Sequence, residues 1–324
     1  MKLSMALSRY DRHIPLFAGE VAPPEGIELD LVEIGESQPL RGGADRHKRI
    51  LDLEFDIGEM SFSSFIAAVG RDPDLPLVGV PVFPRRFFSV GQIYVNVDSG
   101  IASPQDLVGR RVGLHSFQTT LSVLAKGDLK LEYGVAWEDI EWHCLRPEIV
   151  PVELGDDVTV ELIPEGKNIG TMLCDGEIDA LFSPHPPRAM LDRPDRWRRL
   201  FGDTKAEEAR YFAKYGFCPI MHLMVMKRRL ADDRPDLGPA LIAMFEDAKR
   251  RALDYYDDSN YSMLLWSRYL LEEQRARLAA DVWPNGFKAN RKNVAQFIGY
   301  SHDQRLIAEP FPPEALFHES VLAS

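Results

Sequence analysis

Short aliphatic runs that alternate with helix-patterned segments are the feature that most restricts the fold of this chain. KLSMAL, IELDLVEI and LPLVGVPVF near the N-terminus have the length and apolar content of buried strands, and RHKRILDLEF among them has a helical pattern. A second set, comprising IEWHCL, VTVELI and IDALFS, follows a helix that we expect to begin near Thr119. This order is typical of α/β folds.

The two α/β sets favour a chain of two lobes. They are joined at QIYVNV and again at PIMHLMVM, which indicates one domain inserted into another, with these two strands crossing between the lobes as a hinge. We expect lobe I to comprise residues 1–92 and 221–324 and lobe II residues 93–220, each with a mixed sheet flanked by helices. Ligands of open α/β sheets sit beyond the carboxyl ends of the strands. The polar clusters should therefore face one cleft.

The C-terminal third of the chain changes to helical patterns. Apolar residues between Leu241 and Ala252 mark one amphipathic helix, residues 263–278 mark a second, and a last helix begins near Asn290. These helices can pack on their own lobe or on a partner, so the sequence leaves a homo-oligomer open.

Composition narrows the range of partners. Acidic residues outnumber basic ones by 50 to 38, and the formal net charge of −12 disfavours general binding to nucleic acid or to an anionic membrane. The three cysteines are too scattered for a metal or redox motif. No run is long enough to span a bilayer and the N-terminus lacks a secretory apolar stretch, so we expect a cytoplasmic protein.

Polar residues gather where the predicted strands end. EFDIGEMSFSSF places Glu59 and a cluster of hydroxyls at a strand end, and SFQTT places further hydroxyls at a helix start, where they favour a carboxylate. Arg12 and Arg86 can grip the same anion in a bidentate way. The candidates for binding a small acidic ligand are Tyr10, Arg12, Ser61, Ser63, Arg86, Ser116, Gln118, Thr119 and His185.

Each candidate also has a purely structural explanation. The hydroxyls of SFQTT can cap a helix, and Arg12 can pair with a neighbouring carboxylate. Arg85 is expected to be solvated, and His185 lies in a proline-rich turn. For His222, a place in the core explains the sequence as well as catalysis does. No single candidate is specific on its own.

Several well-known motifs are absent from the sequence. No glycine-rich loop follows a strand, so the sequence has no phosphate-binding motif for a nucleotide cofactor. G-x-S-x-G and H-E-x-x-H are also missing, and Glu59 with nearby histidines has no diagnostic metal spacing. We therefore expect neither a cofactor nor a metal.

Seven blocks in order along the chain carry a family resemblance. YDRHIPL, EFDIGEMSFSSF, VPVFPRRFF followed by IYVN, EYGV, EGKNIGTMLCDGEIDA, FCPIMH and WPNGFKANRKNVAQF resemble the successive motifs of the 4,5-dihydroxyphthalate decarboxylase family, from about residue 2 to about residue 322. The resemblance implies the two-lobed fold of type II periplasmic solute-binding proteins. It also implies a decarboxylase that acts on hydroxylated aromatic diacids without an organic cofactor.

The sequence departs from the family pattern at a few positions. Ser89 and Val90 stand where the pattern resembles an Arg-His pair, Phe117 replaces a usual Tyr, and Leu124 replaces a usual Trp. These differences leave the exact substrate open, so another aromatic or aliphatic acid is an alternative.

Removal of CO2 from a hydroxylated ring requires a group that anchors the substrate, a base and an acid. We expect Arg12 and Arg86, assisted by hydroxyls, to anchor the retained carboxylate. We expect Glu59 and His222 to serve as base and acid, with Asp11 orienting Arg12 or a histidine. A solute-binding protein without catalysis and a dehydratase on the same scaffold are the alternatives, because function depends on the site rather than on the fold.

Overall fold

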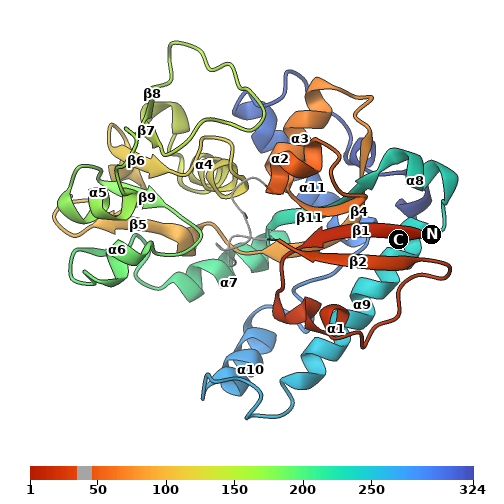
Figure 1. The fold of residues 1–324 in the computed structure, drawn as a ribbon. Helices are drawn as coiled ribbons and strands as arrows, with labels where there is room; N and C mark the ends of the chain where they lie inside the picture. The colour runs from red at the N-terminus through yellow and green to blue at the C-terminus, as the bar shows by residue number, and fades with distance from the viewer. Residues whose placement is uncertain (35–45) are drawn as a thin grey trace.

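The structure, a computed structural model, describes residues 1–34 and 46–324, which form two mixed sheets flanked by helices (Figure 1). The first sheet has the order β2-β1-β3-β11-β4 and consists of β1 (Lys2–Leu7), β2 (Glu28–Glu33), β3 (Ile57–Ser61), β4 (Leu77–Arg86) and β11 (Ile220–Lys227). The second has the order β10-β5-β9-β6-β7-β8 and consists of β5 (Ile93–Asn96), β6 (Arg111–Leu114), β7 (Glu141–Cys144), β8 (Val160–Leu162), β9 (Ala180–Phe182) and β10 (Trp197–Arg199). The expected two-lobed α/β fold is confirmed.

The predicted crossing strands do not cross between the sheets. QIYVNV forms β5, which pairs antiparallel with β9 and β10 in the second sheet. PIMHLMVM forms β11, which pairs antiparallel with β3 and β4 in the first sheet. The chain passes between the lobes in the short segments 87–92 and 216–219 instead. The exact lobe boundaries given above stay a prediction.

Helices cover both sheets. Those packed around the first sheet and its edges are α1 (Ile14–Phe17), α2 (Arg46–Leu51), α3 (Phe62–Arg71), α8 (Arg228–Asp233) and α9 (Leu237–Tyr255). Those around the second are α4 (Thr120–Tyr133), α5 (Ile169–Asp175), α6 (Arg188–Leu191) and α7 (Thr204–Tyr215). The C-terminal helices are α10 (Ser267–Arg277) and α11 (Phe287–Asp303). The sequence analysis did not foresee α6, α7 or β10.

Two of these helices begin with side-chain caps that the sequence provides. The Ser61 hydroxyl accepts the backbone N–H of Ser64 at the start of α3, and the Thr119 hydroxyl accepts that of Ser122 at the start of α4. Such caps satisfy backbone donors that otherwise have no partner in the first turn. Helix α4 ends at Gly134, whose φ of 68° is a conformation that favours glycine. The cap residues thus fix where both helices start.

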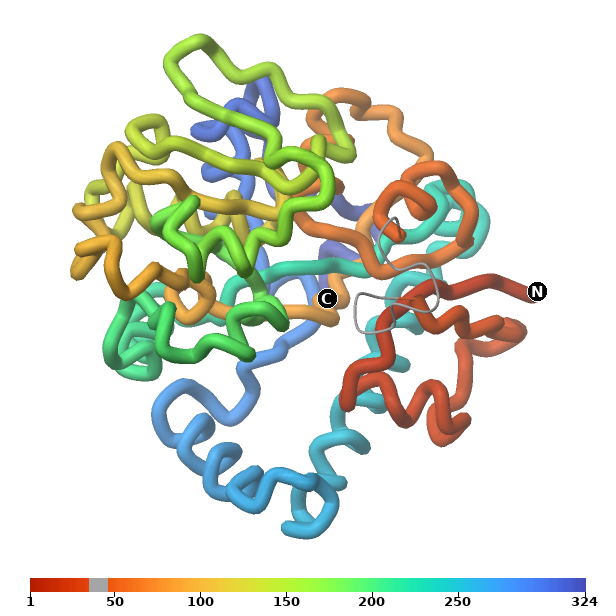
Figure 2. The backbone as a smooth tube through the Cα atoms, turned by 60° about the vertical axis from the view of Figure 1, so that its left-hand side comes forward, coloured from red at the N-terminus to blue at the C-terminus, as the bar shows by residue number. Residues whose placement is uncertain are grey.

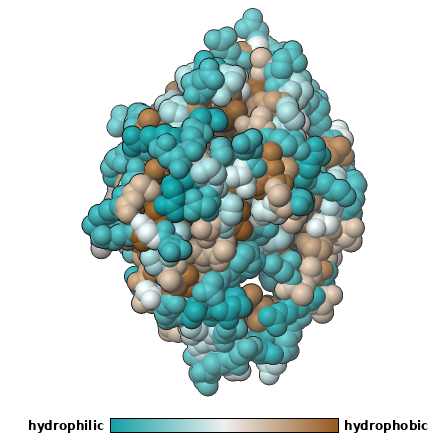
Figure 3. Space-filling model, turned by 90° about the vertical axis from the view of Figure 1, so that its right-hand side faces the viewer, coloured by the Kyte–Doolittle hydropathy of each residue, from teal (hydrophilic) through white to brown (hydrophobic). Residues whose placement is uncertain are grey.

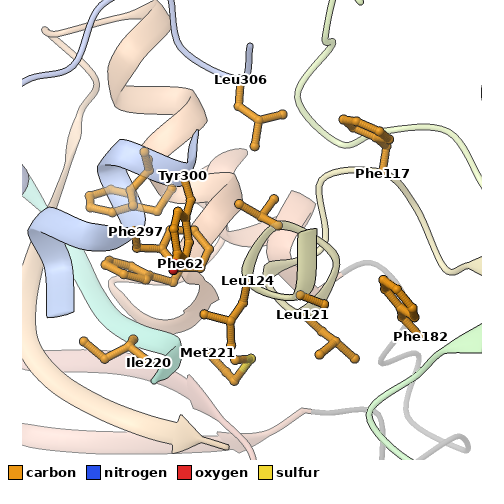
Figure 4. Packing of buried hydrophobic residues seen from close by; sticks show 14 of the residues in the cluster. Phe62, Phe117, Leu121, Leu124, Phe182, Ile220, Met221, Phe297, Tyr300 and Leu306 are labelled. Atoms are coloured by element: carbon orange, nitrogen blue, oxygen red, sulfur yellow. The ribbon is translucent and has the colours of Figure 1, made fainter. Parts of the chain in front are cut away.

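One hydrophobic core runs through both lobes. Phe62 of α3 lies against Phe297 of α11, with ring centroids 4.9 Å apart, and Leu124 of α4 approaches the same cluster with Tyr300 (Figure 4). Helix α11 therefore sits between α3 of lobe I and α4 of lobe II. Truncating such a buried Phe to Ala typically costs about 3–5 kcal/mol. The face shown in Figure 3 is mostly hydrophilic, because most apolar side chains are buried in the core and most charged ones remain at the surface.

A buried carboxyl group connects segment 87–92, which links the lobes, to α4 and α11. Asp128 of α4 is 2% exposed; it accepts hydrogen bonds from the Ser89 hydroxyl at 2.6 Å and from the Tyr300 hydroxyl at 2.9 Å. Burial raises the pKa of Asp128 to about 7, although the hydroxyl donors oppose that shift. Ser89 is one of the positions at which the sequence departs from the family pattern.

Asp128→Asn is expected to remove a pH dependence of stability. Because the folded pKa of about 7 exceeds the ordinary value of 3.8, the native state holds this proton more tightly, and the stability it contributes is lost as pH rises through about 7. A shift of this size corresponds to at most about 4 kcal/mol. Urea unfolding at about pH 5 and about pH 8 measures the effect for both proteins.

The control for this prediction is Asp139→Asn, which changes an exposed carboxylate near the end of α4. Wild type and the control should lose stability alike between the two pH values, and Asp128→Asn should lose less. If all three proteins respond equally to pH, the carboxyl of Asp128 does not titrate in this range.

Candidate active site

Two helix N-termini from different lobes meet at the cleft. The Ser61 hydroxyl lies 2.9 Å from the Thr120 hydroxyl, which also accepts the backbone N–H of Ser63 at 3.2 Å. Helices α3 and α4 thus direct the positive ends of their dipoles toward one place. Unpaired N–H groups and hydroxyls at such a place favour a bound anion.

The cleft between the lobes is lined by cationic, imidazole and apolar side chains. It contains about 670 Å³ of space, including the solvent at its mouth. The arginine and histidine side chains in the wall are Arg85, Arg146, His47, His115 and His222. The apolar ones include Leu121, Ile149, Phe182 and Met221, of which Leu121, Phe182 and Met221 lie near one another in Figure 4. Among the described residues no carboxylate lines this cleft. In a chain of net charge −12, such a wall is suited to an anion with an apolar body.

Glu59 lies directly behind this wall rather than in it. Its side chain is fully buried, and its Oε1 accepts a hydrogen bond from Nδ1 of His222 at 2.6 Å. The Tyr10 hydroxyl donates to the same oxygen at 2.9 Å, and the Ser8 backbone N–H donates to Oε2 at 2.9 Å. A guanidinium nitrogen of Arg46 is 3.7 Å away. Glu59 at the end of β3 therefore holds a cleft histidine in place.

The charge state of this pair follows from its surroundings. Burial alone raises the pKa of Glu59, but the Arg46 charge and the hydrogen bond from His222 outweigh it and hold that pKa well below its usual value. Burial lowers the pKa of His222 to about 4 against the opposing effect of Glu59. At neutral pH the carboxylate is therefore ionised and the imidazole is neutral.

The hydrogen bond to Glu59 also sets the tautomer of His222. An ionised carboxylate only accepts, so Nδ1 carries the proton and Nε2 is left as an acceptor. A nitrogen of Arg46 lies 3.2 Å from the same Nδ1, but a guanidinium cannot donate to a protonated nitrogen, and the shorter bond to the carboxylate decides the assignment. Because His222 lines the cleft, its Nε2 is available to take a proton from a ligand.

A second imidazole stands beside His222. The ring of His47 packs edge-on against it with centroids 5.2 Å apart, and Nδ1 of His47 accepts the Ser61 backbone N–H at 3.0 Å. Burial, with the Arg46 charge, holds the pKa of His47 well below its usual value, so this ring is also neutral. The sequence analysis placed His47 only within a helical pattern and missed it as a site residue.

Segment 145–159, which we call the strap, joins β7 to β8 and supplies Arg146 and Ile149 to the cleft. It is fixed to lobe II by Glu148, whose carboxylate accepts the backbone N–H groups of Phe117 and Gln118 at 2.5 and 3.0 Å. The side-chain amide of Gln118 in turn pairs with both backbone groups of Val150, at 2.6 and 3.1 Å. The side chain of Gln118 therefore forms its hydrogen bonds with the strap.

The strap also reaches across to lobe I. Val150 packs against Ala67 and Ala68 of α3, and a guanidinium nitrogen of Arg71 donates to the Pro151 carbonyl at 2.7 Å. These contacts link the two lobes beside the cleft. The backbone N–H of Arg146 itself donates to the His115 carbonyl of lobe II at 3.1 Å.

Several predicted site residues lie in the cleft or behind it. Ser61, Ser116, Gln118, Thr119 and His222 line the wall, whereas Glu59 and Tyr10 form the hydrogen-bonded layer behind His222. Thr119 and Ser61 also cap helices, as the structural alternative stated. Ser63 is fully buried, and its backbone rather than its hydroxyl contacts Thr120.

The structure contradicts the predicted arginine anchors. Arg86 is 4% exposed and donates to the carbonyls of Cys218 and Pro284 and to the Asn290 side chain, at 2.9, 2.8 and 2.5 Å. It ties β4 to the C-terminal segments and does not line the cleft. Neighbouring residues of a strand point to opposite faces, so the adjacent Arg85, expected to be solvated, is the one in the cleft wall.

Three further candidates do not line the cleft. The Arg12 guanidinium is stacked 4.2 Å from both the Tyr10 and Trp283 rings and donates to the Pro84 carbonyl. Asp11 accepts from Arg12 and, at 2.7 Å, from the Tyr256 hydroxyl, so it orients Arg12 but touches no cleft histidine in the described structure. His185 is exposed beside the cleft residue Pro184.

Comparison with known proteins decides the family. No family model matches the sequence. A Comamonas testosteroni protein named 4,5-dihydroxyphthalate decarboxylase is 31% identical over an alignment of 332 residues, which covers all of this chain and 98% of that relative. The chain belongs to the 4,5-dihydroxyphthalate decarboxylase family. A Pseudomonas putida protein of the same name is 30% identical over 218 residues, covering 65% of this chain and 81% of that one. The family resemblance of the motifs is thus confirmed, and the family is one of carboxy-lyases.

Solved structures support the fold of this family member. The periplasmic aliphatic sulphonate binding protein SsuA of Escherichia coli has a TM-score of 0.57 at 14% identity, and the match covers the whole chain and 99% of SsuA. This similarity confirms the periplasmic-binding-protein-like fold. Within the described residues no helix is both long and apolar enough to cross a membrane, and no group of three or more His, Cys, Asp or Glu is arranged to hold a metal ion.

Proposed function

We propose that this protein is a decarboxylase that acts on a hydroxylated aromatic dicarboxylic acid such as 4,5-dihydroxyphthalate, bound in the cleft between the lobes. Two relatives carry the name of that activity, one of them aligned over the full chain. The observation that carries the proposal is the Glu59–His222 pair behind a wall of cationic and apolar side chains. An imidazole whose Nδ1 is held by a buried carboxylate is an arrangement suited to general acid–base catalysis.

The cleft wall suits the two ends of such a substrate. Arg85 and Arg146, with the N-termini of α3 and α4, are the proposed partners of the carboxylates. Phe182, Leu121 and Ile149 provide apolar contacts for the ring. The ring hydroxyls then face the imidazoles in this arrangement.

The proposed chemistry begins with a proton transfer to His222. Its Nε2 takes the proton of the hydroxyl para to the departing carboxylate, and Glu59 stabilises the imidazolium that forms. The phenolate directs electron density to the ring carbon, which takes a proton from solvent. The bond to CO2 then breaks, its electron pair returns to the ring, and His222 returns the hydroxyl proton. Overall one proton replaces one CO2.

The proposal is tested by ligand binding followed by product analysis. Thermal unfolding with phthalate, 4-hydroxyphthalate and 4,5-dihydroxyphthalate should show stabilisation by each diacid that binds, since a ligand of the native state raises the melting temperature. CO2 release should occur with hydroxylated diacids only, because phthalate cannot form the phenolate. Stabilisation without CO2 from any of them would favour a binding protein, which the SsuA-like fold permits, and loss of water would indicate a dehydratase.

A further inference from the structure

Two irregular segments form most of the lobe II side of the cleft. Segment 115–119 joins β6 to α4, and the strap, within the yellow-green segment at the top of Figure 2, joins β7 to β8. Among the described residues, the backbone hydrogen bonds between the two segments end at Arg146, whose N–H donates to the His115 carbonyl. The cleft residues that the two segments supply are His115, Ser116, Gln118, Thr119, Arg146 and Ile149.

Beyond Arg146 two side chains take the place of backbone partners. The Glu148 carboxylate of the strap accepts the backbone N–H groups of Phe117 and Gln118. The Gln118 amide pairs in return with both backbone groups of Val150. We call Glu148 and Gln118 the clamp. Each clamp residue forms two hydrogen bonds with the opposite segment, and such a double contact fixes orientation as well as distance.

A buried lysine holds segment 115–119 from the other side. Nζ of Lys126, a fully buried side chain of α4, donates to the Phe117 carbonyl at 2.9 Å. Burial holds the pKa of Lys126 well below its ordinary value. The backbone of Phe117 is therefore fixed at both of its polar groups, its N–H by Glu148 and its carbonyl by Lys126. Segment 115–119 thus gives the strap a fixed support.

The clamp determines where Arg146 and Ile149 lie. Glu148 stands between them in the sequence, and only Pro147 separates it from Arg146. Because a proline ring fixes its own φ and restricts the residue before it, a shift of Glu148 moves Arg146 as well. A cavity of about 920 Å³, including open solvent, lies beside this part of the strap, with Arg146, Pro147 and Glu148 in its wall. Packing alone therefore does not hold Arg146 in place.

We propose that Glu148 is a positioning residue for ligand binding, which together with Gln118 holds Arg146 and Ile149 where they reach the bound anion. Glu148 itself is not among the described residues that line the cleft. The inference rests on the proposed function for the identity of the ligand, an aromatic dicarboxylate, of which Arg146 contacts a carboxylate and Ile149 the ring. An acidic side chain thus strengthens the binding of an anion, which is the opposite of the effect of its charge alone.

A double-mutant cycle, measured by calorimetric titration of the full chain with phthalate, tests the proposal. Glu148→Ala should raise Kd about 10-fold in the wild type, but by less than about 3-fold in the Arg146→Met background, because the side chain that Glu148 positions is already absent there. Equal factors in the two backgrounds would indicate a general effect on the fold. Tighter binding of phthalate by Glu148→Ala would indicate an effect of charge. Either result overturns the proposal.

Two comparison variants separate positioning from stability. Glu148→Gln keeps the size of the side chain and can still accept one of the two N–H groups, so its Kd should lie between those of wild type and Glu148→Ala. Glu207 is a half-buried carboxylate on α7 that accepts hydrogen bonds from the Tyr133 hydroxyl and from Arg210. Glu207→Ala should lower the melting temperature and leave Kd unchanged. A rise in Kd equal to that of Glu148→Ala would contradict a specific role of the clamp.

Hydrogen exchange gives a second readout that needs no ligand. In Glu148→Ala the amides of residues 146–152 should exchange faster than in wild type, whereas those of α6 should not change. Unchanged exchange in residues 146–152 would show that the clamp does not hold the strap. Failure of the wild type to bind phthalate, or to release CO2, would instead refute the proposed function, and the exchange result would still decide the role of Glu148.

Discussion

Glu59→Gln is expected to lower kcat by about 10²- to 10⁴-fold while ligand affinity stays within a few-fold of wild type. The amide keeps the shape of the side chain but no longer stabilises the imidazolium of His222, which Oε1 contacts at 2.6 Å. Because Glu59 lies behind the cleft wall, the ligand loses no direct contact. Turnover of 4,5-dihydroxyphthalate, followed by CO2 release, and binding of phthalate measure the two quantities separately.

The same variant is expected to be less stable, and this effect must be separated from catalysis. Arg46 and Glu59 form a buried ion pair, with a guanidinium nitrogen 3.7 Å from Oε1, and removing one charge of a buried pair typically costs about 3–5 kcal/mol. Activity should therefore be measured well below the melting temperature of the variant. Circular dichroism at the assay temperature shows whether the fold is intact.

His222→Ala should lower kcat at least as much, and His143→Ala is its matched control. His143 is a half-buried histidine on β7 that does not line the cleft. In wild type, kcat/KM should fall as pH decreases toward about 4, because protonation of His222 removes the base. Wild-type turnover in Glu59→Gln, or equal losses in His222→Ala and His143→Ala, would remove the pair from the mechanism.

The fold followed from the sequence because its signals are local and periodic. β1 to β4 and α4 arise from apolar runs, caps and the helical period, which a short window contains. The sequence placed the hinge at β5 and β11, and the chain passes between the lobes directly before these strands; that each strand pairs within one sheet depends on contacts far apart in the chain. The same limit applies to α10. Its helical pattern was predicted from the sequence, but whether its apolar side chains pack against the rest of the chain was not, and none of its residues is buried.

The candidate site was predictable in kind but not in detail. Glu59, His222 and the hydroxyls of SFQTT were recognised, because strand ends and helix starts bring such residues to one edge of a sheet. The choice between Arg85 and Arg86 depended on which face of β4 meets the cleft, and sequence alone does not specify it. The strap and His47 carry no local motif, since their roles arise only when the lobes meet.

The second large effect is expected for the cleft arginines. Arg146→Met should raise the dissociation constant for phthalate about 10- to 100-fold, since a hydrogen bond to a charged group contributes about 1.5–3 kcal/mol and 1.4 kcal/mol is tenfold. The combined Arg85→Met and Arg146→Met variant should bind more weakly still. Both side chains are only half-buried, so the melting temperature without ligand should change little. Calorimetric titration and thermal unfolding measure binding and stability.

Arg86→Met is the matched comparison, because it removes a neighbouring arginine of the same strand. This change removes one of the two side-chain donors to each of the carbonyls of Cys218 and Pro284. It also takes from the Asn290 side-chain oxygen the donor that Arg86 supplies, and a buried group left unpaired costs about 1–3 kcal/mol. The comparison variant should therefore lose melting temperature, whereas its affinity measured below that temperature should remain close to wild type. The reverse pattern, with weak binding in Arg86→Met and normal binding in Arg146→Met, would return the anchor to Arg86 and require a different cleft for the substrate.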